Sequence, residues 1–172
     1  FKTAISSTVK SLSNIQKIEV LFGNQSVKTE QNSIKLPDLN SHGNKLNFEE
    51  IRAVAASKSL KLRFSKKKIF EKYQPEGNIS KRLYEISEKI RCEKIGTSYF
   101  KGVKANIEKF YKERIRNLDL KSSENKMIES FENFLRSKFL DYKNEIEIEK
   151  KLKTYKKDIN DQFKDSLSEL QD

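Results

Sequence analysis

The sequence predicts a mainly α-helical, multi-helix domain built around one long central helix, with a small antiparallel β-hairpin near the N-terminus. Apolar residues at about residues 79–117 recur at the spacing of one helix face. At about residues 18–36, two short apolar runs flank the turn signal Gly23-Asn24. The hydrophobic and charged fractions are both 35%, which favours helices with wide solvated faces.

The central helix is predicted from steps of three, four, five and nine residues along one apolar stripe. Its members are Ile79, Leu83, Ile86, Ile90, Tyr99, Val103, Ile107, Phe110 and Ile115. An unbroken helix of about 40 residues would be about 60 Å long. A bend near Gly96 is the alternative, but we expect one continuous scaffold helix.

The N-terminal part combines a short helix with the hairpin. Phe1, Ile5, Val9 and Leu12 have the spacing of an amphipathic helix. The run Ile18–Phe22 is typical of a strand, and Ile34–Pro37 is expected to pair back on it, with Pro37 at its end.

Three further helical regions are predicted. Asn47 is a good cap for a helix that ends at about Phe64, and Ser65 can cap a short helix from Lys66 to Tyr73. Ser122 or Ser123 can cap a third helix. A final helix carries apolar residues from Ile148 to Leu170 at steps of three and four.

The net charge of +11 raises the question of an anionic partner. Most of the excess positive charge is lysine interleaved with acidic residues, as on solvated helix faces. A basic nucleic-acid-binding module is therefore the alternative hypothesis. The densest basic patch comprises Lys61, Arg63, Lys66, Lys67 and Lys68. It is either solvated surface or a contact for an anionic partner.

Sequence motifs of catalysis, cofactor binding and metal binding are absent. There is no phosphate-binding loop, no dinucleotide fingerprint and no zinc ligand pattern. We expect Cys92 to be a packed thiol and His42 a solvated turn residue. A single cysteine fits the reducing cytoplasm, and no apolar run is long enough to span a membrane. Because the chain begins at Phe1, we expect it to be a piece of a longer protein.

One motif resembles a known family. The segment from Arg82 to Gly96, followed by Phe100 to Ile107, resembles the N-terminal region of the T subunit of aerobic cobaltochelatase, the CobT family. Its approximate form is E-x-x-R-x-E-x-x-G, then x-G-V-x-x-N-L. The matching positions are Glu88, Arg91, Glu93, Gly96, Gly102, Val103 and Asn106, with Ile107 in place of leucine.

Other segments are similar to the same family in the same order. They are Phe1-Lys2 with Ala4, Ile18-Glu19-Val20, Ile34 to Asp38, and Arg52 to Arg63. The last segment departs from the family pattern: Ala53 replaces a glycine and Ala56 an acidic residue. A His-Asp pair expected after that helix is replaced near Phe64 and Ser65.

The resemblance implies a role in ATP-dependent insertion of Co²⁺ into hydrogenobyrinic acid a,c-diamide during cobalamin synthesis. In that family a large subunit holds the tetrapyrrole, an AAA+ subunit hydrolyses ATP, and the T subunit assembles with the AAA+ subunit. Residues 1–172 would be a single N-terminal helical domain, without the C-terminal von Willebrand A-type domain. It would be a non-catalytic assembly domain that binds no cofactor itself, although the whole complex uses ATP, Mg²⁺ and Co²⁺.

Two interpretations of the motif residues remain open. Glu88, Arg91 and Glu93 form a charged cluster that either fixes the helix to other parts of the chain or faces a partner. Gly96 and Gly102 each cost a helix about 1 kcal/mol relative to alanine, which is understandable where another backbone approaches or the helix bends.

Overall fold

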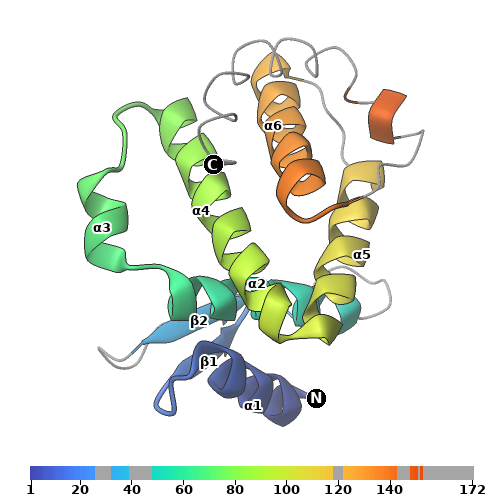
Figure 1. Ribbon diagram of the computed structural model, residues 1–172. Helices are drawn as coiled ribbons and strands as arrows, with labels where there is room; N and C mark the ends of the chain where they lie inside the picture. Colours follow the sequence, from blue (N-terminus) through green and yellow to red (C-terminus); the bar gives the residue numbers. More distant parts are fainter. Residues whose placement is uncertain (26–31, 39–47, 118–121, 143–147, 151, 153–172) are drawn as a thin grey trace. The chain divides into compact units, whose positions relative to one another are not determined.

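The computed structural model describes residues 1–25, 32–38, 48–117, 122–142, 148–150 and 152, with the backbone alone for Ser123. The predicted mainly α-helical fold is confirmed. The elements in chain order are α1 (Lys2–Ser13), β1 (Glu19–Phe22), β2 (Ser33–Leu36), α2 (Phe48–Phe64), α3 (Lys67–Lys72), α4 (Asn78–Tyr99), α5 (Lys101–Asn117) and α6 (Ser123–Phe139) (Figure 1).

The chain forms two compact units. Unit 1 comprises Phe1–Phe70 and Cys92–Phe110, and unit 2 comprises the described residues of Glu71–Arg91 and Tyr111–Asp172. The first part of α4 and the last part of α5 therefore belong to unit 2, while their joined ends belong to unit 1.

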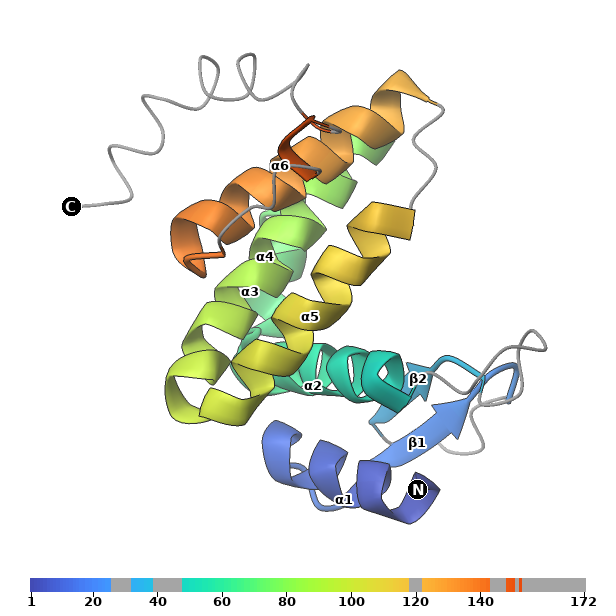
Figure 2. The same cartoon turned by 90° about the vertical axis from the view of Figure 1, so that its right-hand side faces the viewer.

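In unit 1, α1 and α2 pack on each other and border the two strands (Figure 2). Their apolar faces and those of the strands share one core cluster, in which the buried members are Ile5, Val9, Ile18, Phe22, Ile34, Leu36, Ile51 and Ala55. The predicted N-terminal helix is confirmed: α1 ends at Ser13, and Asn14, its C-cap, has a left-handed φ of 58°.

The two strands are parallel, so the predicted antiparallel hairpin is wrong. Glu19 pairs with Ser33 and Phe22 with Leu36, and the N–H of Gly23 bonds to the carbonyl of Leu36 at 3.0 Å. The apolar pattern that identified the strands contains no information about their direction.

The predicted continuous central helix is also wrong, because the chain leaves the helical path at Phe100, between α4 and α5. Gly96, four residues earlier, stays inside α4. The break allows Phe100, Val103 and Ile107 to join the same core cluster as Leu60 of α2, which a straight helix would not bring back to α2. Burial of these side chains therefore decides where the helix ends.

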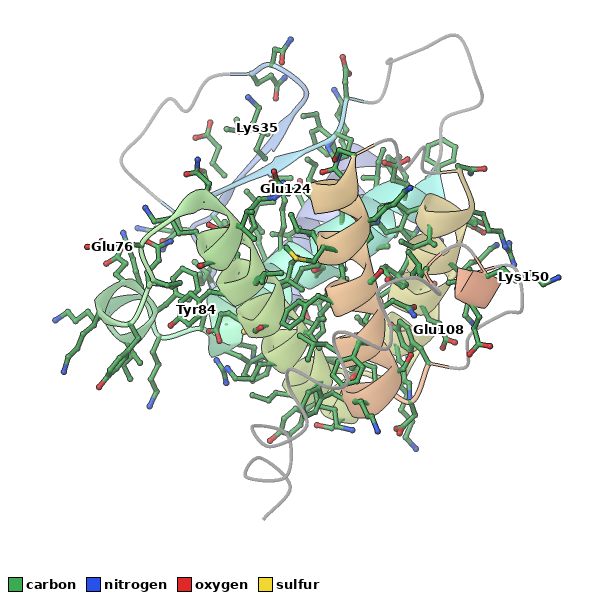
Figure 3. All side chains as sticks on the ribbon, turned by 90° about the horizontal axis from the view of Figure 1, so that it is seen from above. Lys35, Glu76, Tyr84, Glu108, Glu124 and Lys150 are labelled. Carbon is green, nitrogen blue, oxygen red and sulfur yellow. The ribbon has the colours of Figure 1, made fainter. Side chains whose placement is uncertain are left out.

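The short helix α3 has no buried side chain. Its side chains are drawn as sticks beside Glu76 in Figure 3. The prediction placed this helix at Lys66 to Tyr73, one residue longer at each end than the structure.

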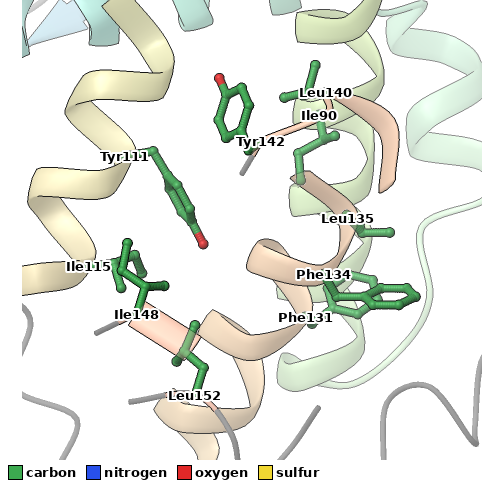
Figure 4. Packing of buried hydrophobic residues seen from close by; sticks show 10 residues of the cluster. All are labelled: Ile90, Tyr111, Ile115, Phe131, Phe134, Leu135, Leu140, Tyr142, Ile148 and Leu152. Carbon is green, nitrogen blue, oxygen red and sulfur yellow. The ribbon is translucent and has the colours of Figure 1, made fainter. Parts of the chain in front are cut away.

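In unit 2, residues of α4, α5 and α6 share a second core (Figure 4). Its buried members are Ile90, Tyr111, Ile115, Phe131, Phe134, Leu135, Leu140, Tyr142, Ile148 and Leu152. The hydroxyl of Ser122 accepts a hydrogen bond from the N–H of Asn125 at 3.1 Å, which confirms Ser122 as the cap of α6.

Some predictions fall outside the described residues: the turn histidine His42, the cap Asn47 and the final helix beyond Leu152. Within the described part of the chain, no helix combines the length and apolar character that a membrane span requires.

Candidate functional site

Glu88 and Arg91, the first two motif residues, form an ion pair on α4 in unit 2. Arg91 donates from Nε to Glu88 Oε2 at 2.7 Å and from Nη2 to Oε1 at 2.9 Å. Three positions of separation place the two side chains on one helix face. Because the Arg91 side chain is 48% exposed, solvent screening leaves the pair with a small contribution to stability.

Glu93 does not join that pair. It is fully buried in unit 1, where the hydroxyl of Ser57 on α2 donates to its Oε1 at 2.5 Å. Two residues along a helix turn a side chain by about 200°, so Glu93 lies on the other side of α4 from Arg91. A buried carboxylate needs such a donor because its desolvation is costly. This hydrogen bond joins α2 to α4.

Gly96 lies one turn after Glu93, directly against Leu60 of α2. A Cβ atom added to Gly96 would lie 2.3 Å from Leu60 Cδ2 and 2.8 Å from its Cγ. Leu60 is fully buried, so its whole side chain would have to move. Gly96 therefore permits a close approach of α2 and α4.

Gly102 and Asn106, the motif residues of α5, are exposed. Apart from its chain neighbours and its own helix backbone, no atom of the described residues lies within 4 Å of the position of a Cβ on Gly102, so close packing there does not explain this glycine. Exposed positions 102, 105, 106 and 109 follow the three- and four-residue spacing of one helix face. We call these four positions the α5 face.

The residues of the predicted basic patch differ in their surroundings. Arg63 donates from Nη1 to the carbonyls of Ser11 and Leu12, both at 3.4 Å, at the C-terminal end of α1. Lys61 places its Nζ 4.9 Å from the centre of the Phe70 ring. The remaining three members, Lys66, Lys67 and Lys68, are exposed.

Sequence reasoning missed a buried ionic network in unit 2, centred on Glu132 of α6. Glu132 accepts from Lys89 of α4 at 3.0 Å, from Arg114 of α5 at 3.0 Å and from Arg136 of α6 at 2.8 Å. Arg114 also makes two bonds to Glu129, at 2.8 and 2.7 Å. One carboxylate thus links three helices.

Two tyrosines border this network. The guanidinium carbon of Arg136 lies 4.5 Å from the ring centre of Tyr111 and 5.7 Å from that of Tyr142, and that of Arg114 lies 5.3 Å from Tyr111. Such cation–π contacts help to compensate the desolvation of a buried guanidinium. Burial, with the charge of Glu132, raises the pKa of Tyr111 well above its usual value, so the phenol stays protonated.

The network keeps Glu132 ionised. Burial alone would raise the pKa of Glu132, but the charges of Lys89, Arg136 and Arg114 and the hydrogen bond from Arg136 hold it well below the usual range. The pKa of Arg114 is raised, because Glu132 and Glu129 outweigh the effect of its burial. Groups with such pKa values do not exchange protons near neutral pH, so the network suits the fixing of helices.

The sequence did contain a signal for this network. Glu132 lies four residues after Ile128 and four before Arg136, in register with the apolar face of α6. Acidic and basic residues four apart on a helix are typical of surface pairs, and nothing local distinguishes a surface pair from a buried one. Among the described residues, His, Cys, Asp and Glu side chains do not gather in groups of three as a metal site would require.

The family model described as "Cobalamin biosynthesis protein CobT" matches residues 1–172, the whole chain. No solved structure matches the chain.

The close approach at Gly96 predicts a position-specific effect of alanine. Gly96→Ala should lower the free energy of unfolding by about 1–3 kcal/mol, because the added methyl group overpacks the contact with Leu60. Gly102→Ala is the matched control: it should leave the stability unchanged or raise it by up to about 1 kcal/mol, because alanine favours the helix. Urea denaturation measures both, and equal effects of the two variants would contradict the close approach.

The buried network predicts a defined pH dependence. The pKa of Glu132 is lower in the folded chain than the unfolded value of about 4.3, so its stabilisation is present above that value and is lost as the pH falls towards the folded pKa. Glu132→Gln should cost about 3–5 kcal/mol at neutral pH, because it leaves buried cations without their carboxylate.

The difference in free energy of unfolding between wild type and Glu132→Gln should therefore narrow as the pH is lowered, measured by urea denaturation from neutral to acidic pH. Glu124→Gln is the control, since Glu124 makes an exposed pair with Arg82 at 2.9 Å and should have little effect. A difference that stays constant with pH would show that Glu132 is not held ionised in the folded chain.

Proposed function

The chain belongs to the CobT family of cobalamin biosynthesis proteins, and from this premise we propose that it is a non-catalytic assembly domain of the aerobic cobaltochelatase. In this proposal the domain binds the AAA+ subunit or the large tetrapyrrole-binding subunit and couples ATP hydrolysis to Co²⁺ insertion. Residues 1–172 supply contacts, and the other subunits supply the chemistry.

The observation that carries the proposal is the division of the family motif into a buried part and an exposed part. Glu93 and Gly96 contribute to the packing of α2 against α4: Glu93 accepts a hydrogen bond from Ser57, and Gly96 leaves room for Leu60. Gly102 and Asn106 are exposed on the α5 face, and the packing of the described chain gives no reason for a glycine at position 102. A helix position without a Cβ allows the backbone of a second protein to approach closely.

The buried ionisable groups support a non-catalytic role. Among the described residues, the buried charged side chains are Glu93, Glu132 and Arg136, and each makes hydrogen bonds within its own unit. Catalytic acids and bases need pKa values near the working pH, whereas the pKa of Glu132 is held far from neutrality. These groups are suited to stabilising the helices that present the α5 face.

The α5 face is also held in place. Ile107, on the opposite side of α5, is buried in the cluster with Leu60, whereas the exposed ion pair of Lys109 with Glu49 of α2 at 2.6 Å contributes little. A preformed helical face loses little conformational entropy when it binds, which favours its use as a contact surface.

The proposal predicts that the 172-residue chain co-purifies with the AAA+ subunit, the large subunit or both, and binds neither ATP nor Co²⁺ on its own. Gly102→Trp and Asn106→Trp should weaken the complex by roughly tenfold or more, because each places a large side chain on the contact surface. Surface plasmon resonance with the immobilised subunits measures the affinity.

Ser7→Trp, at an exposed position of α1, is the matched control and should bind as wild type. If the wild-type chain bound neither the AAA+ subunit nor the large subunit, the proposed function would be refuted. Binding with normal affinity by the two α5 variants would refute the location of the contact.

A further inference from the structure

The two-stranded sheet of unit 1 has two outer edges, one on β1 and one on β2. Parallel sheets usually have both faces covered, and a two-stranded sheet on its own is marginally stable. Along each outer edge, the strand presents backbone N–H and C=O groups on the side away from its partner. Such a row is a template on which another chain can add a strand. The groups that occupy these rows therefore decide whether the sheet can grow.

The register of the strands identifies which backbone groups face outwards. The N–H of Glu19 bonds to the carbonyl of Asn32 at 3.0 Å, so the backbone groups of Glu19 face β2. Four residues later, the N–H of Gly23 bonds to β2 in the same way. Alternate residues of a strand direct both backbone groups to opposite sides of the strand. The outward-facing residues are therefore two in each strand: Val20, Phe22, Ser33 and Lys35.

One outward-facing residue of each strand is already bonded to a side chain. On β2, Nζ of Lys58 in α2 donates to the carbonyl of Lys35 at 2.6 Å. On β1, the N–H of Phe22 donates to Oε1 of Gln25 at 3.0 Å. Each contact takes up a backbone group that an added strand would have to bond. Because each edge has two outward-facing residues, one occupied residue leaves too few bonds for a stable third strand.

The contact of Lys58 is maintained against unfavourable electrostatics. Burial lowers the pKa of Lys58, and the positive charge of Lys35 lowers it further. A lysine on a helix surface usually extends its ammonium group into water. Lys58 instead places its ammonium group on the backbone of β2, which lies beside α2 (Figure 1). The hydrogen bond to the Lys35 carbonyl compensates for this arrangement, so the position of Lys58 depends on the strand edge.

Lys35 and Lys58 also make the outer edge of β2 positive. Both side chains are exposed, and Lys35 is labelled in Figure 3. A second copy that paired through its own β2 would bring the lysines of both copies together. Like charges on neighbouring strands destabilise their pairing, and lysine on an edge strand is a common means by which natural sheets avoid association. The charge therefore acts in the same direction as the hydrogen bond of Lys58.

We propose that Lys58 and Gln25 keep the sheet two-stranded by closing its outer edges against a second copy of this chain. Lys58 closes the edge of β2 through its hydrogen bond and its charge, and Gln25 closes the edge of β1 through its hydrogen bond alone. The two side chains thus prevent copies of the chain from associating through their strands. The proposal depends neither on the α5 face nor on the chelatase assignment.

Sedimentation velocity of the 172-residue chain at increasing concentration tests the proposal. Lys58→Ala frees the carbonyl of Lys35 and removes the cation, so this variant should self-associate at concentrations at least roughly tenfold below those at which the wild type does. The double variant with Gln25→Ala should associate more strongly still, because both edges are then open. Lys58→Arg keeps a donor and a charge at this position and should behave as the wild type.

Arg52→Ala and Gln16→Ala are the matched controls. Arg52 is another exposed cation of α2, so its loss changes the net charge as much as the loss of Lys58 does. Gln16 is another exposed glutamine of unit 1. Each control should change the concentration at which the chain associates by less than about twofold. Thermal unfolding of every variant verifies that the chain is folded.

Hydrogen exchange locates the contact in the associated Lys58→Ala variant. The N–H groups of Ser33 and Lys35 should become protected from exchange, because they would bond to the added strand. A Lys58→Ala variant that associates no more than the wild type would overturn the proposal, and so would association that leaves these two N–H groups unprotected. Equal association of the Arg52→Ala variant would also overturn it, since the loss of one charge would then be sufficient by itself.

Discussion

Unit 1 depends on the contact between Leu60 and Gly96, because it sets how closely α2 and α4 approach. The absent Cβ leaves room for the leucine side chain, and Glu93 one turn earlier then lies within hydrogen-bonding distance of Ser57. Leu60 also shares its cluster with Leu12 of α1 and Ile107 of α5. One glycine thus enables α2 to serve as the common neighbour of three helices.

In unit 2, a network of charged side chains joins the helices. Glu132 of α6 binds cations from α4 and α5, and the neighbouring aromatic rings cover the guanidinium groups. Exchange of a buried ion pair for apolar residues is often neutral or stabilising, so its benefit lies in specificity. A shift of α6 by one turn would keep the pair of Glu132 with Arg136 but separate Glu132 from Lys89 of α4 and Arg114 of α5, so the network favours one register of the three helices.

The motif positions do not form a single site, although they follow one another in sequence. Glu93 and Gly96 serve the packing of unit 1, the pair Glu88–Arg91 lies on the surface of α4 in unit 2, and Gly102 and Asn106 are exposed on α5. A pattern shared with a family therefore combines residues that stabilise the fold with residues open to contact. Burial distinguishes the two groups, and burial is a property of the folded chain.

The sequence by itself determined the helical segments, the apolar faces that enter the two cores, a capping serine at 122 or 123 for α6 and the family, because spacing, capping and motif order are local properties. It also predicted one residue of an expected close approach, Gly96, but not its neighbour Leu60. Only the tertiary structure decided the direction of β2, the helix break at Phe100 and the burial of Glu132. These features depend on contacts between residues far apart in the chain, such as Phe100 with the Leu60 cluster and Glu132 with Lys89. The free energy of such contacts outweighs local preferences, and a periodic pattern contains no information about which partner a side chain meets.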